Sequence, residues 1–162
     1  MSEKSAKESQ NYLTRMGVTG MTNTIVKNYD GQQVELNNGE LITAATVIWA
    51  AGIKGNVPAG IDPELIVRGN RISTDRYCKV KGSNNIYAIG DLAYMETPKF
   101  EKGHPQVAPV GMQQAGMLAK NFIKESKGSN ELQEFEYFDK GSMATVGRNK
   151  AVVDVPKPKL HF

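Results

Sequence analysis

The chain has 162 residues, of which 40% are hydrophobic and 23% charged, a balance that is typical of a globular protein rather than a disordered one. Its formal net charge of +3 is too small to indicate a nucleic-acid partner. The cations are scattered, and Lys150, Lys157 and Lys159 near the end are explained more simply as a solvated tail. Because Cys78 is the single cysteine and the two histidines lie far apart, we expect neither an internal disulfide nor a metal site.

The first third of the chain predicts a helix, a β-meander and one buried strand. Residues 2–16 have the spacing of an amphipathic helix, with Ala6 on its apolar face. Residues 18–41 alternate in the manner of strands and turn at Asp30-Gly31 and Asn38-Gly39, which predicts a meander. Residues 46–52 then form an apolar run that predicts a buried strand.

The rest of the chain predicts a loop, a strand, a longer loop, a helix and further strands. Glycines and prolines gather in residues 53–63, which indicates a loop or a domain boundary, and again in residues 96–109, which indicates a long loop. Apolar residues at helical spacing predict a helix over residues 110–124, closed by a glycine. Further strands are expected in residues 134–155. The chain has no apolar run long enough to span a bilayer and no signal peptide, so we expect it to be soluble.

Residues 85–91 are the most informative segment, because they read as a short apolar strand that ends in Gly-Asp. Residues 86–89 can be buried on both faces of a parallel sheet. Gly90 then allows the backbone to turn and to approach a ligand closely. Asp91 would lie at the carboxyl end of the strand, where open α/β sheets bind their ligands, and could accept hydrogen bonds from sugar-like hydroxyls. The alternative is that Asp91 caps a helix beginning at residue 92.

Residues 46–52 form a companion to this strand. They also run from an apolar segment into small residues, here Ala51 and Gly52, and stop sharply. Taken alone, these small residues indicate only a tight turn after a strand. Two such strands, the second of which ends in Gly-Asp, favour a nucleotide site, because a dinucleotide that crosses a strand end needs small residues beneath it. Trp49 is assigned to the core rather than to stacking on a ligand.

Together, residues 46–53 and 86–91 resemble two motifs of the two-dinucleotide-domain flavoprotein reductases. Residues 105–114 and 138–148 are similar to segments of one family among them, the type II NADH:quinone oxidoreductases, and the resemblance covers most of the chain. It implies an α/β fold class: an incomplete FAD/NAD(P)-binding Rossmann-like two-domain fold with a β-meander. Residues 1–56 would be the C-terminal part of the NAD(H)-binding domain, and residues 57–162 the C-terminal part of the FAD-binding domain.

The resemblance also implies an activity for the parent enzyme. NADH would give a hydride to FAD, and two electrons would pass on to a quinone. FAD and NADH are the implied cofactors, the quinone is the implied partner, and no metal is required. The family implies a protein peripheral to the membrane, at the cytoplasmic face of the inner membrane.

The resemblance implies specific roles for the residues that match the family's motifs. Gly90 and Asp91 would hold the ribityl chain of the flavin. The backbone N–H groups of Gly111 and Met112, at the start of a helix, would stabilise negative charge on the reduced flavin. The alternative for this helix is an ordinary buried helix with a proline at its start.

Other matching positions lie toward the quinone and the nicotinamide. The resemblance puts Gln113 near the quinone end of the flavin, although glutamines on helices are often simply solvated. Pro109 stands where the family often has a glutamine that contacts the quinone. Lys140 would approach the flavin, and a solvated lysine in a turn is an equal alternative. Ala51 and Gly52 would face the nicotinamide.

The chain has no G-x-G-x-x-G turn, although the family has two. We therefore expect a C-terminal fragment that is inactive alone. Because an incomplete sheet exposes strand edges, we expect a homodimer, with strand swapping as one form of it. Two alternatives stay open. One is a fragment of a sulfide:quinone or disulfide reductase, which would need a redox cysteine pair; the other is a non-enzymatic module that associates with itself.

Overall fold

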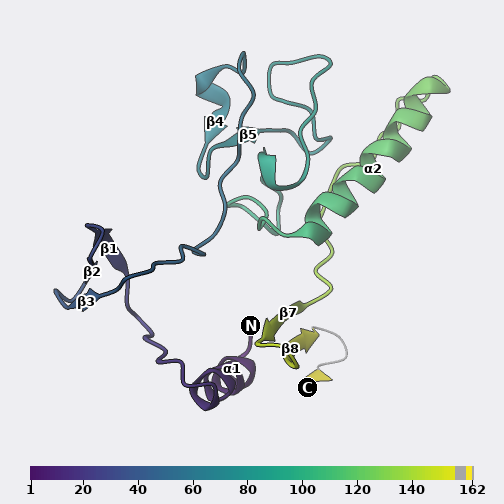
Figure 1. Cartoon of the computed structure of the whole chain (residues 1–162). Helices are drawn as coiled ribbons and strands as arrows, with labels where there is room; N and C mark the ends of the chain where they lie inside the picture. The colour runs from purple at the N-terminus through teal and green to yellow at the C-terminus, as the bar shows by residue number, and fades with distance from the viewer. Residues whose placement is uncertain (156–159, 162) are drawn as a thin grey trace. The chain divides into compact units, whose positions relative to one another are not determined.

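The computed structural model describes residues 1–155 and the backbone of 160–161, so Lys157 and Lys159 of the expected solvated tail lie outside the described residues. The chain forms two compact units (Figure 1). The first unit combines Met1–Ala50 with Lys140–Phe162, and the second unit is Ala51–Asp139. These bounds differ from the expected division after residue 56. The assignment of the two parts to NAD(H)- and FAD-binding domains stays a prediction.

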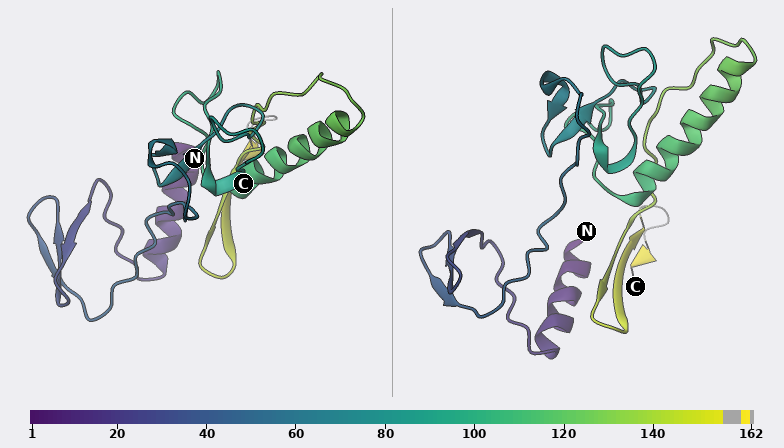
Figure 2. Two further views of the ribbon diagram at one scale, coloured as in Figure 1. Left: turned by 90° about the horizontal axis from the view of Figure 1, so that it is seen from above. Right: turned by 45° about the horizontal axis from the view of Figure 1, so that its top comes forward.

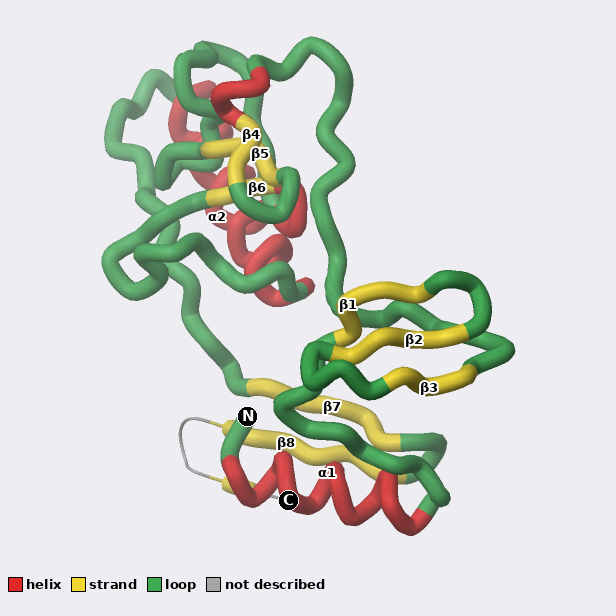
Figure 3. Tube along the Cα trace, turned by 90° about the vertical axis from the view of Figure 1, so that its left-hand side faces the viewer, coloured by secondary structure: helices red, strands yellow, loops and turns green. Residues whose placement is uncertain are grey.

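Helix α1 (Glu3–Arg15) confirms the first predicted helix and is capped at its N-terminus by two residues from different elements. The Ser2 hydroxyl oxygen accepts a hydrogen bond from the Ser5 N–H. Asp154, in strand β8 (Lys150–Val155), accepts hydrogen bonds from the hydroxyls of Ser2 and Ser5, each at 2.7 Å. A carboxylate at this end also complements the helix dipole. Helix α1 contacts β8 along this side (Figure 3), so Ser5 is buried and Ala6, expected on the buried face, is exposed.

The strands of the first unit form two antiparallel sheets. The predicted meander is confirmed, with strands in the order β1 (Val26–Tyr29), β2 (Gln33–Leu36) and β3 (Leu41–Thr43). The second sheet contains β7 (Ser142–Val146), β8 and β9 (Leu160–His161). Strands expected from residue 134 onward therefore begin only at Ser142.

The prediction of a buried strand over residues 46–52 is wrong. This segment forms no strand, and Ile48 and Trp49 are 86% and 67% exposed, so Trp49 is not a core residue. An apolar run becomes a buried strand only when other strands supply hydrogen bonds and cover its faces. None of the described residues pairs with it.

The second unit contains one small sheet. Strand β4 (Ile66–Val67), which follows the 3₁₀ turn η1 (Pro63–Leu65), pairs antiparallel with β5 (Arg71–Ser73). Strand β5 pairs in parallel with β6 (Ala93–Tyr94). A core of small and branched side chains supports this sheet: Ile72, Val80, Ala88 and Ala93.

The expected strand over residues 86–89 is only partly formed. One edge pairs with the preceding segment, through hydrogen bonds from Val80 N–H to the Ile86 carbonyl and from Ala88 N–H to the Cys78 carbonyl. No strand in the described part of the chain pairs with its other edge. The prediction that this segment is buried on both faces is therefore wrong. Ala88 is buried, whereas Ile86 is 46% exposed and Ile89 is also exposed.

Helix α2 (Ala108–Ser126) confirms the predicted helix and extends it by two residues at each end. It follows Val107 as the N-cap residue, has Pro109 in its first turn, and is followed by Gly128, whose φ is +75° as expected of a residue that ends a helix. Its buried face repeats at intervals of four, three and four residues: Val110, Gln114, Met117 and Asn121. Two polar residues therefore share the apolar face.

The segment that follows α2 runs back alongside it (Figure 2) and is attached by amide side chains. The Asn121 amide donates to the Gln133 carbonyl and accepts from the Gln133 N–H, both at 2.9 Å. The Gln113 amide makes the same pair of bonds with Phe138, both at 3.0 Å. Apolar side chains fill the space between: Cys78, Met95, Val110, Met117, Phe135 and Tyr137. Within the described residues, no helix is both long and apolar enough to cross a bilayer.

Helix α2 packs tightly against the segment around Gly90 through a contact between two glycines. A Cβ atom placed on Gly111 would lie 3.1 Å from the Cα of Gly90. Gly116, one and a half turns further along α2, has no atom within 4 Å of the position of its absent Cβ. The absence of a side chain is therefore a packing requirement at Gly111 and not at Gly116.

We predict opposite effects of alanine at these two positions. Gly111→Ala should lower the free energy of unfolding by about 1–3 kcal/mol, because the new methyl group forces two backbones apart. Gly116→Ala should raise it by about 0.5–1 kcal/mol, because alanine loses less backbone entropy in a helix. Urea unfolding of both variants tests this, and equal effects of the same sign would contradict the close contact.

Candidate functional site

The Gly-Asp segment forms a 3₁₀ turn, η2 (Gly90–Leu92), which contacts α2. Gly90 has a φ of +64°, in the left-handed region that glycine tolerates at little cost. Its N–H donates a 2.7 Å hydrogen bond to Oε1 of Gln114, which is 1% exposed. The turn is thus fixed to the buried face of α2.

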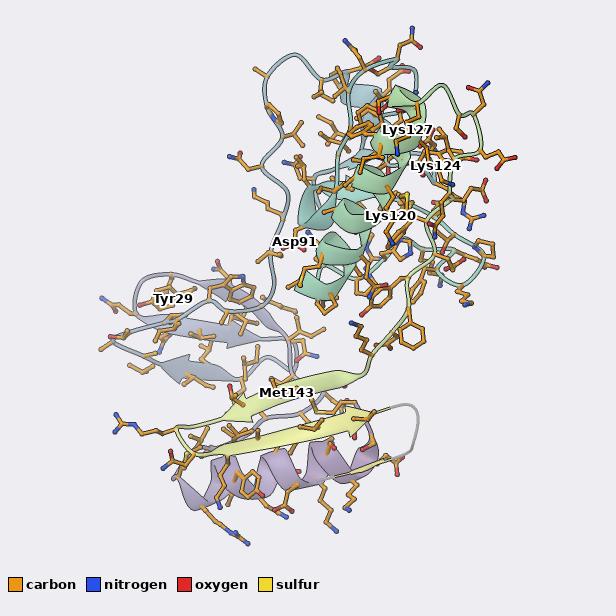
Figure 4. All side chains as sticks on the ribbon, turned by 90° about the vertical axis from the view of Figure 1, so that its right-hand side faces the viewer. Tyr29, Asp91, Lys120, Lys124, Lys127 and Met143 are labelled. Atoms are coloured by element: carbon orange, nitrogen blue, oxygen red, sulfur yellow. The ribbon has the colours of Figure 1, made fainter. Side chains whose placement is uncertain are left out.

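Asp91 presents its carboxylate to the surface beside the N-terminal half of α2 (Figure 4). Its backbone carbonyl accepts a 2.9 Å hydrogen bond from Nε2 of Gln106. The carboxylate itself makes no hydrogen bond or ion pair with any residue that the structure describes. The N-cap alternative for Asp91 is wrong, because Ile89 occupies that position before η2 and no side chain caps the turn. Both carboxylate oxygens can therefore accept hydrogen bonds from a ligand.

The start of α2 offers a different backbone N–H group to a ligand than the sequence predicts. Because the helix begins at Ala108, the N–H groups of Gly111 and Met112 fall within its hydrogen-bonded ladder and cannot donate to a ligand. The Val110 N–H bonds to the Val107 carbonyl at 3.0 Å, and proline at position 109 has no N–H. Among the described residues, the N–H at this end without a partner is that of Ala108. Gly111 instead allows the close contact with Gly90.

Among the described residues of the second unit, no hydrogen bond joins the other expected site residues to the Gly90–Asp91 turn. The Gln113 amide is occupied by its two bonds with Phe138. Lys140 is exposed and belongs to the first unit. Ala51 and Gly52 are exposed and lie in irregular backbone, with no hydrogen bond to the turn. Met112 is 74% exposed on α2.

The sequence patterns assign no ligand-binding role to Gln106 or Gln114, the two glutamines that hold the turn, and Gln114 is expected there only as a helix residue. For Gln114 a signal was present, since it continues the buried spacing of Val110 and Met117 along the helix. A polar residue on an apolar face must find a partner, and here the partner is Gly90 N–H. No comparable signal marks Gln106, which lies in a loop.

A buried arginine fixes the loop that carries Gln106. Arg71 in β5 donates from Nη1 to the His104 carbonyl at 2.9 Å and from Nε to the Arg68 carbonyl at 3.2 Å. Its guanidinium also lies over the ring of Tyr94, 4.8 Å from the centroid. Burial lowers the pKa of Arg71, although arginine stays charged. The loop that leads into α2 is thus attached to the small sheet.

His104 is buried in the same loop among the rings of Phe100, Phe135 and Tyr137. Its Nε2 lies 3.4 Å from the Thr97 hydroxyl, which donates a 2.8 Å bond to Glu136. Its Nδ1 has no hydrogen-bond partner of ordinary geometry among the described residues, although the Met95 backbone is close enough to favour the charged ring. Burial is the largest effect and lowers the pKa of His104.

Cys78 has the properties of a structural cysteine. Its side chain is buried in the apolar cluster around Met117, and burial raises the pKa of its thiol to about 12. The thiolate is the reactive form of cysteine, so this thiol is inert near neutral pH. Cys78 is free, and the chain has no second cysteine with which to form a redox pair.

Comparison with known sequences gives a family match and a curated relative. The family model described as pyridine nucleotide-disulphide oxidoreductase matches residues 1–115. The type II NADH:quinone oxidoreductase of Staphylococcus aureus (strain NCTC 8325 / PS 47) is 34% identical over 123 residues, which are 76% of this chain and 29% of the relative. The chain therefore spans less than a third of that relative's length.

Two solved structures resemble the chain in space. NDH2 from Plasmodium falciparum in complex with NADH matches with a TM-score of 0.77 at 17% identity, over 99% of this chain and 48% of that chain. The sulfide:quinone oxidoreductase from Aquifex aeolicus matches with a TM-score of 0.69 at 13% identity, over 94% of this chain and 37% of that chain. These likenesses confirm the expected fold class, a partial α/β fold of the FAD/NAD(P)-binding kind.

The buried histidine predicts a specific pH dependence of stability. Burial lowers the pKa of His104 below the ordinary 6.5, and the charges of Arg71 and Arg76 act in the same direction, against the smaller opposing effects of the Met95 backbone and of Glu136. The folded chain thus takes up this proton less readily than the unfolded chain. The contribution of His104 to stability is complete above pH 6.5 and is lost as the pH falls through the lowered pKa.

Replacement of the histidine should remove this dependence. Urea unfolding of the wild-type chain and of His104→Gln, measured at several values between about pH 7.5 and pH 5, should show a shallower loss of stability in the variant. An identical slope in both chains would contradict the assignment.

Proposed function

Because the chain belongs to the pyridine nucleotide-disulphide oxidoreductase family, we propose that it is part of a flavin-dependent NADH:quinone oxidoreductase. The observation that carries the proposal is the 34% identity, over 76% of the chain, to a curated relative of that name. In this proposal a hydride passes from NADH to FAD and two electrons pass on to a quinone.

The residues around η2 fit a flavin. The Asp91 carboxylate is exposed, has no hydrogen-bonding partner among the described residues, and follows a glycine turn, which suits the hydroxyl groups of a ribityl chain. The Ala108 N–H and the positive end of α2 lie in the same part of the second unit, because Gly90 and Gly111 are in contact. Both features favour a ligand that has hydroxyl groups and partial negative charge.

In this mechanism a bound flavin supplies the electron-transfer chemistry, and the chain supplies binding and electrostatics. Asp91 accepts hydrogen bonds from ribityl hydroxyls and fixes the ligand's orientation. The Ala108 N–H, together with the α2 dipole, favours negative charge at the helix end. This backbone donor replaces those of Gly111 and Met112, whose N–H groups serve the helix.

The remaining roles are proposals that rest on the resemblance. Residues 1–56 and 57–162 would be parts of the NAD(H)- and FAD-binding domains. Ala51 and Gly52 would face the nicotinamide, and Lys140 would approach the flavin. Gln113 could contact a quinone only by giving up its bonds with Phe138. A homodimer, and attachment to the cytoplasmic face of the inner membrane, are proposed on the same basis.

A sulfide:quinone or disulfide reductase is the second candidate, because the Aquifex aeolicus enzyme has a similar fold. Those reactions use a redox cysteine pair. Cys78 does not support this candidate, since it is buried and its pKa is about 12. The NADH:quinone proposal is therefore favoured.

Flavin binding tests the role of Asp91. Titration of the 162-residue chain with FAD, followed by flavin fluorescence, should show binding that Asp91→Ala weakens at least about tenfold, because hydrogen bonds to a charged group are lost. Glu101→Gln, which changes another exposed carboxylate of the second unit, is the matched control and should bind as tightly as the wild-type chain. Equal affinity of Asp91→Ala and the control would contradict the assignment.

Turnover tests whether the chain acts alone. The sequence has no G-x-G-x-x-G turn with which to hold either dinucleotide's phosphates, so we predict no NADH:menadione oxidoreductase activity from the 162-residue chain. The measurement is NADH oxidation at 340 nm with FAD present. Robust turnover would show that other residues hold both dinucleotides and would overturn the prediction.

A further inference from the structure

We propose that Gln114 and Gln106 are positioning residues that hold the Gly90–Asp91 turn from two sides, so that the Asp91 carboxylate is directed toward a ligand with hydroxyl groups. The inference rests on the proposed function and deepens it, because it names the residues that prepare the flavin-binding group. Neither glutamine needs to touch the ligand.

Gln114 holds the turn on its N-terminal side. Its Oε1 accepts the Gly90 N–H at 2.7 Å, and its side chain is almost completely buried. Val110 and Met117, on the same face of α2, pack into the apolar cluster and keep the helix in place. A buried acceptor on a fixed helix is therefore aimed at a residue that otherwise has unusual backbone freedom.

Gln106 holds the turn on its C-terminal side. Its Nε2 donates to the Asp91 carbonyl at 2.9 Å, from a loop that Arg71 fixes through the His104 carbonyl. The two glutamines thus bind the N–H that precedes, and the C=O that follows, the peptide link between Gly90 and Asp91. With both groups held, rotation of this link is restricted and the Asp91 side chain leaves the turn in one direction.

A turn held in this way binds a ligand more tightly because less conformational entropy is lost on binding. The carboxylate makes no hydrogen bond or ion pair with the described residues, and Arg71 acts on it only through its charge. Positioning therefore depends on the backbone, and the backbone depends on these two amides.

The two sites require opposite hydrogen-bonding roles. At 106 the side chain must donate, and at 114 it must accept. Glutamate has the size of glutamine and accepts but, when ionised, does not donate. Gln106→Glu should therefore lose the hydrogen bond to the Asp91 carbonyl. Gln114→Glu should keep the hydrogen bond from the Gly90 N–H, and Gln114→Met should lose it.

Asn121→Leu is the matched control. Asn121 is also a buried amide on α2 and also binds a backbone N–H and C=O, but those of Gln133 rather than of the turn. Its loss costs the fold at least as many hydrogen bonds as the loss of Gln114. A general loss of stability would thus appear in the control, whereas a loss of positioning would not.

The first readout is FAD affinity of the full chain, measured by flavin fluorescence at a temperature where urea unfolding shows each variant to be folded. Gln114→Met and Gln106→Glu should each weaken binding about tenfold, whereas Gln114→Glu and Asn121→Leu should bind within about twofold of wild type. Combined with Asp91→Ala, Gln114→Met should cause no further loss, because it acts through Asp91. Additive losses, or an equal loss in Asn121→Leu, would overturn the proposal.

The second readout needs no ligand. Hydrogen exchange at the Gly90 amide, followed by NMR, should be at least about tenfold faster in Gln114→Met than in wild type and slow in Gln114→Glu. If the wild-type chain binds no FAD, the proposed function fails, and Gly90 exchange alone decides the positioning proposal. Unchanged exchange in Gln114→Met would overturn it.

Discussion

The contact between Gly90 and Gly111 is the constraint on which the second unit depends. A methyl group at Gly111 would lie 3.1 Å from the Gly90 Cα, closer than a Cβ atom ordinarily approaches, so the two backbones can meet because residue 111 is a glycine. The contact brings Gln114 within hydrogen-bonding distance of the turn. It also places the start of α2 next to Asp91, and the proposed flavin site consists of these two features.

Amide side chains on α2 bind backbone groups that would be paired by neighbouring strands in a larger sheet. The strands of the second unit have only two or three residues each, so few backbone groups are paired within its sheet. Gln113, Gln114 and Asn121 instead bind backbone groups of Phe138, Gly90 and Gln133. Because buried backbone groups must find partners, these amides determine how the irregular segments lie against the helix.

The site combines a backbone turn held by hydrogen bonds with the Asp91 carboxylate, which makes no hydrogen bond with the described residues. The hydrogen bond from Arg71 to the His104 carbonyl fixes the loop that leads into α2. Gln106, in this loop, in turn holds the Asp91 carbonyl. Arg71 donates hydrogen bonds to two carbonyls and acts on Asp91 only through its charge, because no hydrogen bond or ion pair joins the two side chains. A carboxylate whose oxygens make no hydrogen bond with the described residues suits a ligand that brings hydroxyl groups of its own.

Helix α1, the meander, helix α2 and the Gly90–Asp91 turn could all be predicted from local patterns, because caps, two-residue turns and helical spacing act over a few residues. Which side chains are buried depends instead on contacts between distant segments. Residues 46–52 and 86–89 have the composition of buried strands, yet Ile48 and Ile86 are exposed because burial requires covering partners that an apolar run cannot supply. The roles of Gln106 and Gln114 also depend on contacts between segments 15 and 24 residues apart, which local patterns do not encode.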